Sequence, residues 1–258
     1  ALGADCNAST VYSKTYYYFN CTENFEKCLD LLLKHVSQPY FTEQNVEKEK
    51  GIIIQEINMY LDDPYYICGM DLLNLLYKNH PVKKDIAGTE ESVRRITPEM
   101  LYQCHRAFYS PRNMCLTVVG DVDQETIYRA VDRAELPQND CAKIEKLLPK
   151  ESEQLVGTRS ERKMETAMPL FNFGFKDRPE CYAGKDRMRR KLAGNIAKEL
   201  IFGTSSELYE KLYDNGYINY DFYASYEIER DYAMFSIVGA SEQIKLVQDY
   251  ITEYLREL

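Results

Sequence analysis

One stretch, Val46–Pro64, constrains the fold of this chain more than any other. Its apolar residues recur at helical spacing, and the sequence Asp62-Asp63-Pro64 predicts where that helix ends. Glu49 and Glu56 stand seven residues apart, so both carboxylates lie on one face of the helix. A carboxylate on a rigid helix can bind a metal ion while a second carboxylate supports it from the outer shell. On spacing alone, an exposed acidic face is the simpler interpretation.

Length and charge limit the classes of protein to which this chain can belong. Its 258 residues suffice for one large or two medium domains, each with its own core. With 32 basic and 41 acidic residues, the net charge of -9 argues against nucleic acid or a membrane surface as a partner. No apolar run approaches the ~20 residues that span a bilayer, and no leader pattern is present. Because the chain does not begin with Met, we expect a processed or excised piece of a protein.

The cysteines favour a reducing compartment. All eight are dispersed, without a C-x-x-C pair or a zinc-finger spacing. Several fall on apolar faces of predicted elements, where a free thiol packs as a small hydrophobic group. We therefore expect a cytoplasmic protein.

Periodicity predicts alternating strands and helices. Strands at 7–12 and 15–21 form a predicted hairpin, and an amphipathic helix from Thr22 to Gln38 follows it. The other predicted elements are helices at 65–77, 97–109, 123–134, 186–202 and 206–215, and strands at 114–120 and 168–175. In the helix at 186–202, the pattern directs four side chains inward: Met188, Leu192, Ile196 and Leu200. We interpret the basic cluster Lys185–Lys191 beside them as a solvated face.

An internal repeat suggests a duplicated architecture. An offset of 216 aligns Ala8-Ser9 with Ala224-Ser225. The same offset, without a gap, places Tyr12 on Ile228, Tyr16 on Tyr232 and Phe19 on Phe235. Each predicted hairpin leads into an amphipathic helix, and the second of these helices begins near Ser241. Strand, turn, strand and helix is a common succession, so chance similarity remains the alternative.

These patterns predict an α+β fold of duplicated units, in which helices cover one face of a largely antiparallel sheet. Residues 1–135 would form the first unit, incomplete at its N-terminus, and residues 163–258 part of a second homologous unit. The charged, proline-containing stretch 136–162 between them is the predicted linker. Because an incomplete unit leaves apolar surface uncovered, we also expect self-association.

Several segments together resemble the pitrilysin, insulinase and mitochondrial-processing-peptidase family of inverted zinc metallopeptidases, and most closely its bacterial processing proteases. The similarity covers most of residues 1–122 and continues more weakly to the end of the chain. The segments that carry it are Asn7–Thr10, Pro39–Phe41, Glu49–Glu56, His80-Pro81, Ile86–Thr89, Phe108–Met114 and Val118–Val122.

The resemblance implies roles for particular residues. Glu56 matches the distal zinc ligand of the family, and Glu49 matches the acidic residue that supports it. The strand Asn7, Ala8, Ser9 and Thr10 matches the edge along which family members bind an extended peptide. Tyr217 matches a substrate-gripping position. The implied chemistry is hydrolysis of a peptide bond by a zinc-bound water, with a separate glutamate as general base.

Two departures from the family pattern limit these expectations. The H-x-x-E-H motif, which supplies two zinc ligands and the general base, is absent, and His35, His80 and His105 are better interpreted as structural. Near Gly216 the family's arginine is also missing, although Lys211 is present. Since one carboxylate cannot complete a tetrahedral site, we predict that this chain alone neither binds zinc tightly nor cleaves peptides.

Two functions follow from the resemblance. The first is a fragment of a zinc metalloendopeptidase that acts on peptides, with zinc present in the complete protein. The second is a non-catalytic scaffolding subunit that pairs with an active homologue. Both imply a homodimer or a heterodimer with a homologous subunit. An upstream H-x-x-E-H motif would distinguish the first from the second.

Overall fold

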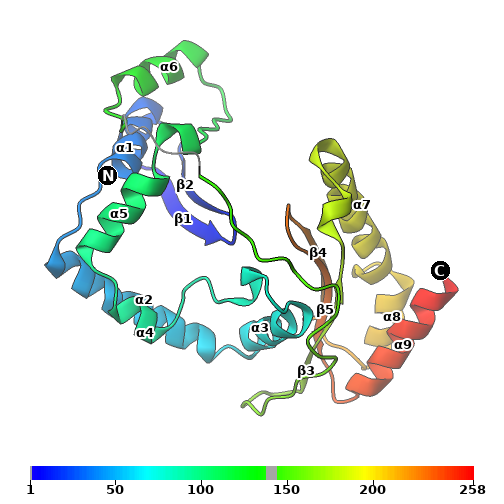
Figure 1. Ribbon diagram of the computed structural model, residues 1–258. Helices are drawn as coiled ribbons and strands as arrows, with labels where there is room; N and C mark the ends of the chain where they lie inside the picture. Colours follow the sequence, from blue (N-terminus) through cyan, green and yellow to red (C-terminus); the bar gives the residue numbers. More distant parts are fainter. Residues whose placement is uncertain (1, 138–143) are drawn as a thin grey trace. The chain divides into compact units, whose positions relative to one another are not determined.

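The computed structural model describes residues 2–137 and 144–258, which form two compact units of helices and antiparallel strands (Figure 1). The first unit comprises Ala1–Ile57 and Ile86–Leu147, and the second comprises Asn58–Asp85 and Leu148–Leu258. Each unit therefore combines segments that are distant in the sequence. The compact units are defined by their internal contacts, whereas the predicted boundaries at 135 and 163 divide the chain into homologous units. Those boundaries therefore stay predictions. Part of the predicted linker, 138–143, lies outside the described residues.

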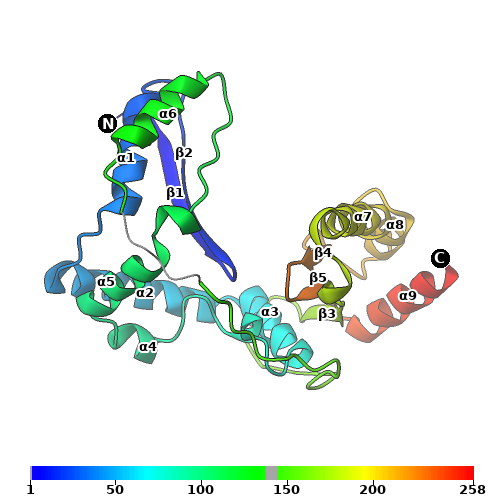
Figure 2. The same cartoon turned by 45° about the horizontal axis from the view of Figure 1, so that its top comes forward.

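The first unit begins with the predicted hairpin, which is confirmed. Strands β1 (Asp5–Val11) and β2 (Lys14–Asn20) pair antiparallel, with Ala8 opposite Tyr17. Helix α1 (Phe25–Ser37) contacts β2 and packs against α6 (Gln124–Arg133). The buried side chains of this small core are Leu29, Leu33 and Ala130. Both helices lie beside the hairpin in two different views (Figure 2).

Three further helices complete the described part of this unit. Helix α2 (Glu43–Leu61) packs against α4 (Glu90–Arg94). The contact is made by Ile54, Ile57 and Val93. Helix α5 (Pro98–Phe108) begins as predicted, because the hydroxyl of Thr97 accepts a hydrogen bond from the Met100 amide and Pro98 fills the first turn.

The predicted strand at 114–120 is wrong. Residues 114–119 run without strand pairing after the short 3-10 turn at Pro111–Asn113. A strand is stable only when a neighbour satisfies its backbone donors and acceptors. The part of the first unit that the structure describes provides no such neighbour for this segment, and Val119 is 94% exposed. The composition of this segment favours a strand, but no described strand pairs with it.

The second unit contains a three-stranded antiparallel sheet in the order β3-β5-β4. Its strands are β3 (Leu170–Lys176), β4 (Tyr223–Ile228) and β5 (Ala233–Ala240). One face is covered by α7 (Gly184–Phe202), α8 (Glu207–Asp214) and α9 (Ile244–Glu257). Phe171, Leu208, Ile237 and Val247 lie in the core that these elements share. Burying each such side chain contributes about 1.5–3 kcal/mol, which makes this core the main source of stability in the unit.

Helix α3 (Pro64–Leu76) packs on the other face of this sheet. Asp63 caps the helix by accepting hydrogen bonds from the Tyr65 and Tyr66 amides. Gly174 of β3 allows the close approach, because a methyl group there would overlap the side chain of Leu72. The sheet is thus covered on both faces, whereas the sequence predicted helices on one face.

A part-buried polar cluster fastens α3 and residues 150–153 to the sheet. The carboxylate of Glu151 accepts hydrogen bonds from the amides of Lys78, Asn79 and His80 at 2.9, 2.7 and 2.6 Å. The ammonium of Lys176 on β3 lies 2.9 Å from the same carboxylate. Burial by itself would raise the pKa of Glu151, but these hydrogen bonds lower it to about 2. Residues 150–153, within the predicted linker, are therefore firmly packed.

The order of elements agrees with the predicted repeat, but the strand registers do not fit its ungapped alignment. Each hairpin, β1–β2 or β4–β5, leads into an amphipathic helix, α1 or α9. Ala8 pairs with Tyr17, however, whereas Ala224 pairs with Ile237. The first strands thus correspond at an offset of 216 and the second strands at 220. The ungapped alignment fails because eight residues separate the paired Ala8 and Tyr17, whereas 12 separate the paired Ala224 and Ile237.

The predicted orientation of α7 is also wrong. Its four regularly spaced apolar side chains point into solvent, with exposed fractions of 59% for Met188, 56% for Leu192, 61% for Ile196 and 73% for Leu200. The opposite face of the helix packs on β4. Gly194 lies there against the ring of Tyr226, and a methyl group at this position would overlap that ring. Close backbone approach at a glycine, rather than apolar periodicity, decides which face is buried.

Two features bear on the predicted environment of the protein. No helix among the described residues is long and apolar enough to cross a membrane. Cysteines in this part of the chain, among them the buried Cys28, are free thiols. Cys141 lies outside the described residues.

The polar cluster predicts that removing the charge of Glu151 lowers the free energy of unfolding. Replacing Glu151 by Gln leaves the part-buried ammonium of Lys176 without its carboxylate, so the free energy of unfolding should fall by about 2–3 kcal/mol at pH 7. The carboxylate has a lower pKa in the folded state than the ordinary value of 4.5, so its contribution is present above pH 4.5 and is lost as pH falls toward about 2. Urea unfolding from pH 7 down to pH 3 measures both effects.

The matched control is Glu153→Gln, which removes an exposed carboxylate that pairs with the exposed Arg178 at 3.4 Å. An exposed pair contributes little, so this variant should unfold within about 0.5 kcal/mol of the wild type. Equal losses for the two variants would contradict the assignment of the stabilising role to the Glu151 cluster.

Candidate functional site

Helix α2 holds the two predicted metal-site carboxylates on a well-defined scaffold. At its start, the Thr42 amide donates to Asn45 Oδ1 at 2.7 Å and the Asn45 amide donates to Thr42 Oγ1 at 3.2 Å. This reciprocal pair is a capping box. The helix ends at Leu61, as the Asp-Asp-Pro sequence predicted, and Asp63 then caps α3. A capped helix fixes the direction in which its side chains project.

Glu49 and Glu56 both lie on the exposed side of this helix. Ile52 and Met59 share that side and are 48% and 61% exposed. The buried side is occupied by other residues of α2, among them Ile54 and Ile57. The structure therefore confirms the shared face and leaves the role of the two carboxylates a prediction. An acidic face that also exposes large apolar side chains differs from an ordinary solvated helix face.

Strand β1 brings together the four residues predicted to bind substrate. Asn7, Ala8, Ser9 and Thr10 are consecutive in β1, and the whole strand is exposed. One edge of β1 pairs with β2, and no other strand of the described chain pairs with its second edge. An open edge presents backbone donors and acceptors in the geometry that an extended peptide needs. Whether substrate binds there stays a prediction.

Tyr217 has a structural role that the sequence did not reveal. It follows Gly216, whose φ of +68° ends α8 in the left-handed conformation. The Gly216 amide donates to the Tyr213 carbonyl, and the Tyr217 amide donates to the Leu212 carbonyl, both at 2.9 Å. These two bonds form a Schellman motif, and the half-buried Tyr217 packs against the core as the motif requires. Nearby Lys211 pairs with Glu207 at 2.6 Å.

A fixed loop beside Tyr217 offers another exposed aromatic ring that the sequence analysis missed. Tyr220 is 81% exposed. Its neighbour Asp221 accepts hydrogen bonds from Tyr65 Oη at 3.1 Å and from Asn219 Nδ2 at 3.0 Å. Burial, followed by the bond to Asp221, raises the pKa of Tyr65 to about 12, so its hydroxyl remains a donor at neutral pH. The signal was hard to find because Tyr65 and Asp221 are distant in the sequence.

The histidines occupy structural positions. His80 is 4% exposed, and its Nδ1 accepts a hydrogen bond from the Val82 amide at 3.1 Å. His105 Nε2 lies 2.9 Å from the carbonyl of Val36, and its ring stacks on Tyr109. The ring of His35 makes an edge contact with Tyr17. Throughout the described residues, no group of three His, Cys, Asp or Glu side chains is placed to hold a metal ion.

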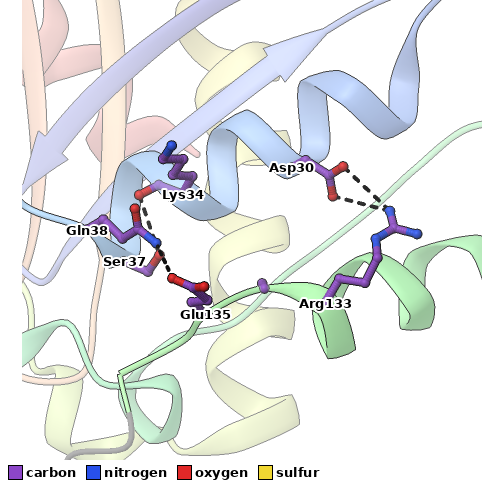
Figure 3. Close-up of a pocket in the computed structure, with 7 residues that line it drawn as sticks. Asp30, Lys34, Ser37, Gln38, Arg133 and Glu135 are labelled. Atoms are coloured by element: carbon purple, nitrogen blue, oxygen red, sulfur yellow. Dashed lines mark hydrogen bonds and ion pairs between the residues drawn. The ribbon is translucent and has the colours of Figure 1, made fainter.

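A polar groove lies between the ends of α1 and α6 (Figure 3). Its volume is about 350 Å³, and polar contacts between lining residues cross it. Arg133 reaches Asp30 at 3.4 Å, and Gln38 Nε2 donates to Glu135 at 3.1 Å. Its lining residues are Asp30, Lys34, Ser37, Gln38, Arg133, Ala134 and Glu135. The groove combines two distant segments, so no sequence motif indicated it.

Comparison with known proteins identifies the family. Residues 1–90 match the family model described as Insulinase (Peptidase family M16), and residues 95–258 match the Peptidase M16 inactive domain. The uncharacterised zinc protease YmfH of Bacillus subtilis is 40% identical over 257 residues, which are 98% of this chain and 60% of that protein. The chain belongs to peptidase family M16. The predicted relationship to the pitrilysin and insulinase group is confirmed.

Solved structures of M16 proteins agree with the predicted α+β fold. The crystal structure of an M16-like peptidase from Alicyclobacillus acidocaldarius is similar at a TM-score of 0.91 and 33% identity, over 99% of this chain and 61% of that chain. The periplasmic protease PqqL of Escherichia coli shares the fold at a TM-score of 0.67 and 19% identity, over 92% of this chain and 27% of that chain. This chain thus spans about 60% of the length of the M16 relative that it matches at 40% identity.

The two family matches divide the predicted site residues. Glu49, Glu56 and the strand Asn7–Thr10 fall within the insulinase match, whereas Tyr217 falls within the inactive-domain match. The metal and edge-strand predictions therefore concern a different M16 domain from the Tyr217 prediction.

Two glycine substitutions should have opposite effects on the stability of the protein, because Gly216 has a left-handed backbone and Gly51 lies within a helix. Gly216→Ala places a Cβ at a φ of +68°, which should lower the free energy of unfolding by about 1 kcal/mol. Gly51→Ala lies inside α2 with open space around the new methyl group, so it should raise stability by about 0.5–1 kcal/mol. Thermal and urea unfolding of both variants measures the difference. A neutral Gly216→Ala variant would contradict the backbone role of this glycine.

Proposed function

We propose that this chain is part of a zinc-dependent M16 peptidase and contributes the distal metal ligand and the substrate-binding strand to its active site. The observation that carries the proposal is the exposed face of α2, where Glu49 and Glu56 project from a capped helix. The insulinase match over residues 1–90 includes this helix and β1. The two histidine ligands and the general base then come from residues outside this chain.

The described residues do not fit a zinc ion by themselves. Catalytic zinc sites use three protein ligands and an open position, and Glu56 offers one carboxylate. We therefore derive no catalytic step from this chain. In the proposed enzyme, Glu56 binds the ion and Glu49 supports the site from the outer shell. The chain alone is predicted to bind no stoichiometric zinc and to cleave no peptide.

Strand β1 is the proposed binding edge for the peptide substrate. A peptide that adds to its open edge forms backbone hydrogen bonds that do not depend on sequence. Its side chains would then alternate between the two faces of the hairpin. On one face they would lie beside Asn7 and Ser9, which are paired with Tyr18 and Tyr16.

Zinc content tests the role of Glu56 directly. In the full-length protein, Glu56→Gln should lower zinc affinity by more than 100-fold, because a carboxylate ligand is replaced by a weakly coordinating amide. Glu49→Gln should lower it about 10–100-fold, as expected for an outer-shell residue. Competition with a chromophoric chelator measures both affinities.

The matched control is Glu47→Gln, on the same helix, where the carboxylate is 70% exposed and pairs with Lys50. This variant should bind zinc as tightly as the wild type. If Glu56→Gln also binds zinc normally, Glu56 is not a ligand and the proposal fails.

A non-catalytic scaffolding subunit is the second candidate function. The match of residues 95–258 to an inactive domain favours it. On this hypothesis the full-length protein binds no zinc and cleaves peptides only when mixed with a homologous active subunit. Zinc bound by the isolated full-length protein, together with peptidase activity that chelation abolishes, would exclude it.

The partner and compartment of the protein are also proposals. We propose a homodimer or a heterodimer with a homologous subunit, as the relationship to peptidase family M16 implies. We propose a cytoplasmic bacterial protein from the dispersed free thiols, although PqqL is described as periplasmic. Fractionation of a bacterial source, with detection of the full-length protein, tests the compartment.

A further inference from the structure

Three cysteines that are separated in the sequence converge on one face of the first hairpin. Cys6 lies in β1 directly opposite Phe19 of β2, so both side chains lie on the same face of the sheet. Cys21 follows Phe19 by two residues and immediately follows the last residue of β2, so it extends the same face. The hairpin therefore brings Cys6 and Cys21 to diagonally neighbouring positions.

Helix α1 covers this face and adds a third thiol to it (Figure 2). The ring of Phe19 lies 6.0 Å from the ring of Phe25, which begins α1. Two residues before Phe19, the ring of Tyr17 lies 5.7 Å from that of His35, in the last turn of α1. The end of β2 thus lies beside the start of α1. Cys28, one turn after Phe25, is buried there.

The three thiols differ in exposure and in chemistry. Cys6 is exposed, Cys21 is half-buried and Cys28 is buried. Burial raises the pKa of the Cys28 thiol, and the nearby Cys21 thiol, to which it is hydrogen-bonded, raises it further; Cys6 adds to the same effect. Cys28 therefore stays protonated at neutral pH. Of the two thiols in contact, the more accessible Cys21 is the one that a small oxidant reaches first.

Two chemistries are open to neighbouring thiols, and the geometry separates them. Among the described residues, no three His, Cys, Asp or Glu side chains are placed to hold a metal ion together, and this cluster is no exception. Two sulfur atoms in hydrogen-bond contact need only side-chain movement to reach the about 2.05 Å of a disulfide. The contact between Cys21 and Cys28 therefore favours a bond between these two.

We propose that Cys21 and Cys28 are a modification site at which hydrogen peroxide forms a reversible disulfide. The Cys21 thiolate attacks one oxygen of the peroxide, the O–O bond breaks, and a sulfenic acid and hydroxide form. The Cys28 sulfur then attacks the Cys21 sulfur, the S–O bond breaks, and the hydroxyl group leaves with the Cys28 proton as water. The two thiols lose two electrons in total, and the peroxide is reduced to two molecules of water.

The disulfide joins the end of β2 to the start of α1 and so restrains the hairpin against its covering helix. A reducing compartment keeps both residues as thiols, which is the form that the structure shows. The site requires neither zinc nor peptide substrate, so its test does not depend on peptidase activity.

Peptide mapping of the oxidised full-length protein tests the proposal. The reduced protein is treated with hydrogen peroxide, its remaining thiols are blocked with iodoacetamide, and it is digested with trypsin. Cleavage after Lys27 separates the two cysteines, so Cys21 falls in peptide 15–27 and Cys28 in peptide 28–34. The expected product is a disulfide-linked pair of these peptides, which dithiothreitol separates. Blocking of both thiols should fall about tenfold, whereas the exposed Cys181 of the second unit should be blocked nearly as in untreated protein.

Two variants separate the roles of the three thiols. Cys28→Ala removes the thiol that completes the bond, so sulfenic acid should accumulate at Cys21. Labelling of peptide 15–27 by dimedone, which traps sulfenic acids, should therefore rise about fivefold over the wild type. Cys6→Ser is the matched control, because it leaves the contact between Cys21 and Cys28 in place. This variant should form the disulfide as the wild type does.

Three outcomes would overturn the proposal. If peptides 15–27 and 28–34 stay unlinked and are blocked as completely as the Cys181 peptide, the thiols only pack against each other. A disulfide from Cys6 to either of the other two would assign the reactive pair differently. Equal dimedone labelling of the wild type and Cys28→Ala would show that Cys28 does not react with oxidised Cys21.

Discussion

The open backbone of a strand edge is the constraint on which the organisation of this protein depends. In the first unit, β1 and β2 pair only with each other among the described residues, and their hairpin is largely exposed. The strand-forming segment 114–119 remains without a ladder for the same reason. The second unit has a third strand and helices on both faces, so its core is larger. An edge that lacks a neighbour is also the proposed substrate-binding surface.

Two helices, α2 and α7, present defined groups of side chains on their exposed faces. Helix α2 presents two carboxylates beside apolar side chains, and α7 presents basic residues beside exposed apolar side chains. The two helices carry opposite charge patterns, acidic on α2 and basic on α7. In the second unit, Glu151 and Lys176 add a part-buried ion pair that fixes the segments around the sheet. Helix capping and buried polar contacts thus place the surfaces that we propose to be functional.

Much of this fold was predictable from local sequence. Thr97 and Pro98 marked the start of α5, and Asp62-Asp63-Pro64 marked the end of α2. Two segments rich in β-forming residues marked the first hairpin. Prediction failed where a distant residue decides the outcome. The buried face of α7 depends on Gly194 meeting Tyr226, and the strand at 114–120 depends on a neighbour that no local pattern reveals.

The candidate site was predicted in its residues but not in its surroundings. Spacing placed Glu49 and Glu56 on one face, and family resemblance proposed their role. The structural role of Tyr217 required the φ of Gly216, which sequence indicates only through the identity of the glycine. The fixed loop at Tyr220 depends on a hydrogen bond between Tyr65 and Asp221, which no spacing rule connects.

The central claim is that Glu56 is a metal ligand completed by residues outside this chain. A crystal structure of the full-length protein, with anomalous scattering measured at the zinc absorption edge, tests it most directly. The account predicts one strong zinc peak about 2.0–2.2 Å from a carboxylate oxygen of Glu56, with two histidines from outside this chain as further ligands. A fully occupied zinc site that does not include Glu56, or no zinc peak in a protein purified with zinc, would contradict it.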